Sequence, residues 1–261
     1  MKSNRTLPRR DDDDDDLNVW ERYVQPIFAE FTGSVLYTFI ACLSVTVNNV
    51  FGIGIVHGFA IAVLCNAFVK ISGGQFNPAV TLASVLSGGT KLVVGLVYLP
   101  FQFIGALLGA AFVKAVIYQY DSFDEIHGGA NMMRGNRRID PFNQYLRTST
   151  WDFGIHSIII IEIIASCAVY LCYLLDNVDD RQPHRAPLYY GMGVSAVVIA
   201  TYFTAGGGFN PAVSFAAAIS SGYWNEHYVY WAGPIVGALI AALLYRVILG
   251  DRRKRLLGKV R

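Results

Sequence analysis

Among the polar residues inside otherwise apolar stretches of the chain, five could do chemistry: Glu30, His57, Asn77, Glu162 and Asn210. The two carboxylates could form a general acid–base pair, or each could accept hydrogen bonds from backbone N–H groups of a nearby glycine-rich loop. We favour the second interpretation, because an isolated charge in apolar surroundings is costly. The two Asn side chains are amides, which could cap helix N-termini or donate a hydrogen bond to a passing oxygen atom.

The composition argues against a soluble enzyme. Hydrophobic residues make up 54% of the 261 residues and charged residues only 15%, against about 25% charged in a typical soluble domain. The four Cys all fall in apolar runs, which disfavours a disulfide framework or a zinc site. Because the sequence also has no Walker loop and no nucleophile elbow, we expect no enzyme activity, cofactor, metal or nucleic-acid partner.

Six stretches are long and apolar enough to span a bilayer, which takes about 20 residues. They cover residues 27–47, 51–71, 92–119, 153–175, 188–204 and 229–249. Six spans place both termini on one side, and most of the 21 Lys and Arg then lie on that side. The positive-inside rule therefore predicts cytoplasmic termini, in a multi-pass protein of the plasma membrane or an intracellular membrane.

Two further apolar segments are too short to span a membrane. Each begins at an Asn-Pro pair, Asn77-Pro78 or Asn210-Pro211, and each follows a glycine-rich stretch. Asn suits the cap of a helix and Pro its first turn. Surface loops with amphipathic helices are one interpretation. Re-entrant half-helices are favoured, because irregular backbone is tolerated at membrane depth where it packs in protein or lines a watery path.

The two short segments belong to an internal repeat. The sequence Phe-Asn-Pro-Ala-Val occurs at residues 76–80 and again at 209–213, Gly-Ala-Leu at 105–107 and 237–239, and Tyr98 matches Tyr230. Each copy holds three spans with a half-helix between the second and third. Because three is odd, the copies have opposite orientations, and such inverted repeats place a pathway where the broken helices meet. The predicted fold is therefore an all-α membrane protein with six transmembrane helices and two re-entrant half-helices.

These features resemble the aquaporin family. The resemblance rests on two Asn-Pro-Ala boxes (Asn77, Pro78, Ala79 and Asn210, Pro211, Ala212), the glutamates Glu30 and Glu162, Ile71-Ser72-Gly73-Gly74, and Tyr-Trp-Ala-Gly-Pro at 230–234. It implies one pore in each subunit, a homotetramer in membrane lipid, and structural roles for the two buried acids. It also implies that Asn77 and Asn210 donate to permeating water and interrupt the chain of hydrogen bonds along which protons would hop.

The resemblance also assigns a selectivity filter, by position relative to the two boxes. The four filter positions correspond to His57, Val198, Gly207 and Val213. Water-selective members usually carry Arg at the last position, so Val213 departs from that pattern. The set is similar to the filter of plant vacuole-type aquaporins, which implies passage of water plus ammonia, urea or hydrogen peroxide. Ser214 stands where glycerol channels carry Asp, which disfavours a dedicated glycerol channel.

The predicted organisation has five parts. An acidic tail, expected to be disordered, covers residues 1–26, the channel repeats cover 27–119 and 153–249, an extracellular loop covers 120–152, and a basic cytoplasmic tail covers 250–261. The leading function is a passive channel for water and small neutral solutes that excludes protons. The alternative is a structural or junctional membrane protein of the same fold with little conduction, which intact boxes and small filter residues disfavour. A coupled transporter would need ionisable groups along the path, where only His57 stands.

Overall fold

The computed structural model describes residues 18–47, 49–117, 123, 127–129, 154–179, 181 and 186–257. These residues form helices and contain no strand. The first half holds α1 (Gln25–Leu43), α2 (Val50–Phe68), α3 (Pro78–Leu86) and α4 (Leu92–Val116). The second holds α6 (Ile155–Tyr173), α7 (Ala186–Thr201), α8 (Pro211–Ser221) and α9 (Val229–Leu244). Most of the acidic tail and of the loop expected at 120–152 lies outside the described residues.

Five of the helical segments are long and apolar enough to cross a membrane, and they run over Trp20–Val47, Val50–Phe68, Leu92–Val116, Ile155–Val178 and Val229–Leu249. Helix α7 has 16 residues, or about 24 Å at the usual rise. It ends at Thr201, before the predicted end at residue 204, because the N–H of Gly206 turns back onto the Thr201 carbonyl. The predicted all-α fold, with long helices and two half-helices, is confirmed.

The long helices pack in three close pairs, α1 with α4, α6 with α9, and α2 with α7. Glycine allows each approach. A Cβ atom at Gly109 of α4 would lie 2.4 Å from the Val35 carbonyl oxygen of α1, and one at Gly237 of α9 would lie 2.9 Å from the Ile163 carbonyl oxygen of α6. The α1–α4 pair of the first half and the α6–α9 pair of the second therefore use the same small-residue contact, as membrane helices commonly do.

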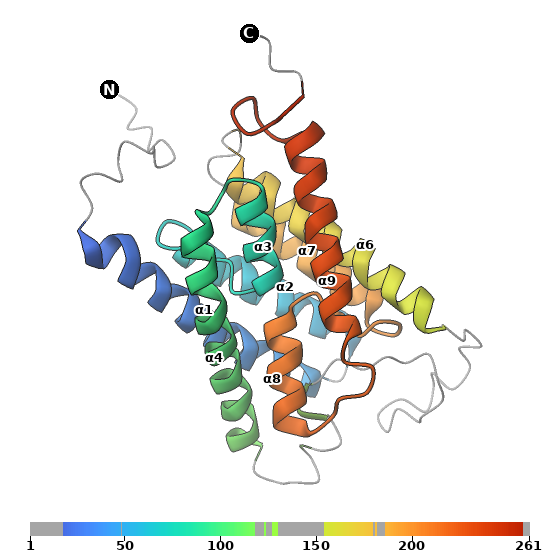
Figure 1. Ribbon diagram of the computed structural model, residues 1–261. Coiled ribbons are helices and arrows are strands. Elements are labelled where there is room, and N and C mark those ends of the chain that lie inside the picture. The colour runs from blue at the N-terminus through green and yellow to red at the C-terminus, as the bar shows by residue number, and fades with distance from the viewer. Residues whose placement is uncertain are drawn as a thin grey trace, which may run out of the picture.

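The two half-helices connect the halves of the molecule. Helix α3 packs against α9 as well as α4, and α8 packs against α4. In Figure 1 the two half-helices lie one above the other in the middle of the bundle, with the longer helices around them. Four small side chains form the α4–α8 contact: Ala106, Ala110, Ala212 and Ala216. Each half-helix is thus held largely by the opposite half of the chain.

The outer faces of the bundle are unusually apolar, while several polar side chains are buried inside it. Large apolar side chains on the outer faces of the helices are exposed, among them Phe59, Val93 and Ile164. Buried side chains inside the bundle include Glu30, Gln102 and Glu162. Apolar patches this extensive mark contact with lipid or with another protein.

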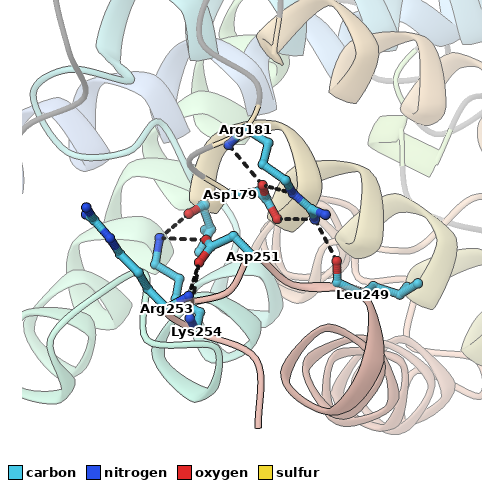
Figure 2. A network of polar contacts seen from close by, with 7 residues as sticks. Asp179, Arg181, Leu249, Asp251, Arg253 and Lys254 are labelled. Atoms are coloured by element: carbon cyan, nitrogen blue, oxygen red, sulfur yellow. Dashed lines mark hydrogen bonds and ion pairs between the residues drawn. The ribbon is translucent and has the colours of Figure 1, made fainter. Parts of the chain in front are cut away.

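A network of polar contacts ties the segment after α6 to the segment after α9 (Figure 2). Arg181 donates two hydrogen bonds to the buried carboxylate of Asp179, at 2.7 and 2.6 Å, and one to the Leu249 carbonyl. Asp179 raises the pKa of the Arg181 guanidinium. Asp251 accepts from the backbone N–H groups that follow it, and Lys254 donates to the Val178 carbonyl. The segment 250–257 is therefore held against this end of the bundle.

Candidate functional site

Asn77 and Asn210 cap the two half-helices. The side-chain oxygen of Asn77 accepts from the Ala79 N–H at 2.9 Å, and that of Asn210 accepts from the Ala212 N–H at 3.1 Å. Both residues have extended backbone, and Pro follows each of them in the first turn. The local sequence sets this geometry, because the amide satisfies an N–H that has no intrahelical partner.

The same two side chains also connect the halves. The Asn77 side-chain N–H donates to the Phe209 carbonyl at 3.0 Å, and the Asn210 side-chain N–H donates to the Phe76 carbonyl at 2.9 Å. Each amide nitrogen has two protons, so one remains for a further acceptor. The positive ends of two helix dipoles meet here with two amide donors, which suits a path for neutral hydrogen-bonding molecules and opposes cations.

The loops that lead into the half-helices use left-handed backbone. Phe76 has φ 47°, and Gly74 and Gly207 have φ 60° and 69°. A β-carbon at Gly33 of α1 would lie 1.9 Å from the Phe76 ring. The absent side chain at Gly33 therefore makes room for the strained residue that precedes the first box.

Glu30 holds the first loop in place. Its Oε1 accepts from the Ser72 hydroxyl at 2.6 Å and from the Gln75 N–H at 3.0 Å. Its Oε2 accepts from the Phe76 N–H at 2.7 Å and from the Gln102 amide at 2.8 Å. Four donors compensate one buried carboxylate, so this geometry provides a support for the loop and leaves no free lone pair directed at a substrate.

Glu162 lies at the matching place on α6 and is equally buried. The backbone N–H of Gly208 interacts with its carboxylate, yet neither oxygen completes a hydrogen bond with the residues that the structure describes. Glu30 and Glu162 occupy equivalent positions in the two repeats, but they therefore differ in the hydrogen bonds that their carboxylates receive.

The four expected filter residues come from three helices and the loop that precedes α8. Val198 on α7 lies beside Gly207, where a Cβ would be 3.6 Å from the Val198 Cγ2 atom. Val213 lies in the first turn of α8, and its N–H reaches the Asn210 side chain at 3.4 Å. His57 lies on α2, and its Nδ1 is 3.4 Å from the Tyr37 hydroxyl of α1. The structure thus brings Val198 and Gly207 together, while His57 is a partner of Tyr37.

Sequence reasoning missed three supporting residues. Gln102 bridges Glu30 and the Thr81 hydroxyl, at 2.8 Å each, and Tyr170 donates to the Phe209 carbonyl. Gln102 could have been found as a lone amide in a long apolar helix. Tyr170 and Tyr37 carry no such signal, because tyrosine is common in apolar segments.

Comparisons with known proteins agree with this arrangement. The family model described as "Major intrinsic protein" matches residues 17–245. Aquaporin-8 of Mus musculus is 33% identical over 247 residues, which cover 93% of this chain and 88% of the mouse protein. Aquaporin C of Dictyostelium discoideum is 32% identical and covers 88% of this chain and 82% of its own length.

A solved structure shows the same fold. The aquaglyceroporin from Plasmodium falciparum superposes with a TM-score of 0.69 at 20% identity, and the match covers 85% of this chain and 95% of that one. The relatives are aquaporins, the family model covers most of the chain, and the two capped half-helices meet inside a bundle of apolar helices. The chain therefore belongs to the major intrinsic protein family of membrane channels for water and small solutes.

Proposed function

We propose that this channel conducts water together with ammonia, urea or hydrogen peroxide, and excludes protons. The observation that carries the proposal is the meeting of Asn77 and Asn210, each with one amide proton committed to the opposite half and one remaining. A water molecule that accepts from these donors must orient its own protons away from the centre. That orientation breaks the continuous donor–acceptor chain that proton hopping requires.

The solute range follows from the assigned filter of His57, Val198, Gly207 and Val213. Three of these residues are aliphatic or lack a side chain, so the opening is wider and less cationic than one lined by Arg. A neutral imidazole at His57 offers ammonia a hydrogen-bond partner. We further propose a homotetramer with cytoplasmic termini, because the outer faces of the helices are apolar and the basic residues lie on the side of the termini.

The test uses purified protein in liposomes. Stopped-flow light scattering should show faster water, urea and ammonia permeation than in empty liposomes, and a trapped pH dye should show no added proton leak. Val213→Arg should retain water conduction and lose urea and ammonia, while Val213→Leu, which adds bulk without charge, should retain more ammonia than the Arg variant. Equal solute permeation in all three proteins would overturn the filter assignment.

A further inference from the structure

Each repeat buries one glutamate at the same position, so the surroundings of the two carboxylates can be compared directly. In the first half, Glu30 accepts from two side chains, Ser72 and Gln102, and from two backbone N–H groups. In the same half the Tyr98 hydroxyl donates to the Ser72 carbonyl at 3.2 Å. Every acidic and phenolic oxygen at this place therefore has a protein partner.

The second half lacks the side-chain donors. The register of the repeat, set by Phe76 with Phe209 and by Tyr98 with Tyr230, places Ala205 opposite Ser72, Gly208 opposite Gln75, and Pro234 opposite Gln102. Each replacement is shorter than its counterpart, and none offers a side-chain donor. The sequence itself thus removes both side-chain hydrogen bonds that the equivalent carboxylate would receive.

Three buried oxygen atoms complete no hydrogen bond within the described part of the chain, although the Gly208 N–H interacts with the Glu162 carboxylate. They are both carboxylate oxygens of Glu162 and the hydroxyl of Tyr230, and each side chain is 1% exposed. Both side chains lie beside Gly208, whose backbone N–H interacts with the Glu162 carboxylate and whose Cβ would lie 2.0 Å from the Tyr230 ring. A Cβ at Gly233 of α9 would lie 2.5 Å from the Glu162 Cγ atom, and the Tyr230 ring lies against Gly208 of the loop.

We propose that ordered water binds between Glu162, Tyr230 and the loop at 205–209, and replaces the hydrogen bonds that Ser72 and Gln102 supply in the first half. A buried carboxylate without donors is strongly unfavourable, and buried water is found where two to four polar partners converge. One water molecule can accept from the Tyr230 hydroxyl and donate to a Glu162 oxygen. A second can serve the other oxygen in the space left by the shorter side chains.

Glu162 and Tyr230 are not among the residues assigned to the solute path. The loop carries Gly207 and leads directly into Asn210, so bound water would fix the second half-helix as side chains fix the first. The two loops would then be supported differently. Side chains of the protein hold the first loop, whereas water that exchanges with solvent would hold the second.

The test is a high-resolution structure of the whole protein in lipid nanodiscs, compared with two reciprocal variants. The unaltered protein should show ordered water within hydrogen-bond distance of both Glu162 and the Tyr230 hydroxyl. Ala205→Ser, which restores the missing hydroxyl, should lose one water and unfold at a higher temperature. Ser72→Ala, which copies the second half into the first, should gain a water beside Glu30 and unfold at a lower temperature.

Two results would overturn the proposal. One is a map of the unaltered protein with no water at this site. The other is a direct hydrogen bond between Glu162 and Tyr230 that leaves no room for water. If either variant fails to fold, the map of the unaltered protein still decides, because it needs no substitution. Water or urea permeability is not the readout, so failure here leaves the proposed conduction standing.

Discussion

Replacing Asn210 by alanine is expected to destabilise the protein more than replacing Asn77, although the repeat gives the two residues equivalent positions. The reason lies in the carbonyl groups that they reach. The Phe209 carbonyl, the acceptor for Asn77, also accepts from the Tyr170 hydroxyl. The Phe76 carbonyl, the acceptor for Asn210, receives no other hydrogen bond from the described residues.

The magnitudes follow from these contacts. Loss of a helix cap costs about 1 kcal/mol, and loss of one hydrogen bond whose acceptor keeps another donor costs about 1 kcal/mol. Asn77→Ala should therefore cost about 2 kcal/mol. Asn210→Ala loses a cap and also leaves a buried carbonyl unpaired, which costs about 2 kcal/mol, and the total is about 3 kcal/mol.

Reversible unfolding by SDS in mixed micelles, followed by circular dichroism, measures both free energies. Asn49→Ala is the matched control, because Asn49 caps α2 through the Gly52 N–H at an exposed site and reaches no carbonyl of the other half. It should cost about 1 kcal/mol. Equal costs for Asn77 and Asn210, or a larger cost for Asn77, would refute the role given to the Phe76 carbonyl.

Three further outcomes are expected. Gly33→Ala, whose Cβ would sit 1.9 Å from a phenylalanine ring, should lower the free energy of unfolding by about 3 kcal/mol. In the same SDS titration Gly154→Ala, with nothing within 4 Å, should cost less than about 1 kcal/mol, because it changes only the N-cap of α6. Burial lowers the pKa of His227, so at acidic pH the unfolded chain binds more protons than the folded one. Thermal stability should therefore fall as the pH drops below about 6.5. In melting curves recorded over a series of pH values, His227→Gln should weaken that dependence. Arg181→Ala should speed hydrogen exchange in residues 251–257, measured by mass spectrometry, and unchanged exchange would contradict the tether at the Leu249 carbonyl.

Local signals in the sequence predicted the half-helices well. Both begin where predicted, at Pro78 and Pro211, because an Asn cap followed by Pro depends only on neighbouring residues. The end of the fifth predicted span, 188–204, was less accurate. Tyr202 and Phe203 continue the apolar run, but the chain leaves the helix at Thr201 to reach the glycines of the loop. A hydropathy profile contains no information about where the backbone must leave the helix.

The contacts at the centre were beyond sequence reasoning for a different reason. The hydrogen bonds from Asn77 and Asn210 to carbonyls of the opposite half depend on how two inverted repeats pack. The contrast between Glu30 and Glu162 was visible in part, since the register of the repeat sets Gln102 against Pro234. What the sequence lacked was the position of each donor relative to the carboxylate, which tertiary structure alone supplies.

The packing of α3 against α9 and of α8 against α4 has a consequence for how the protein is made. During synthesis α3 emerges with its neighbour α4, but its other main partner, α9, is the last of these helices to be made. Part of the α3 surface therefore stays uncovered until α9 is in place. The Asn77 amide likewise meets the Phe209 carbonyl only after most of the chain has left the ribosome. The halves therefore cannot mature one after the other, and a chain truncated before α9 would expose an unsatisfied half-helix to the membrane's quality-control proteases.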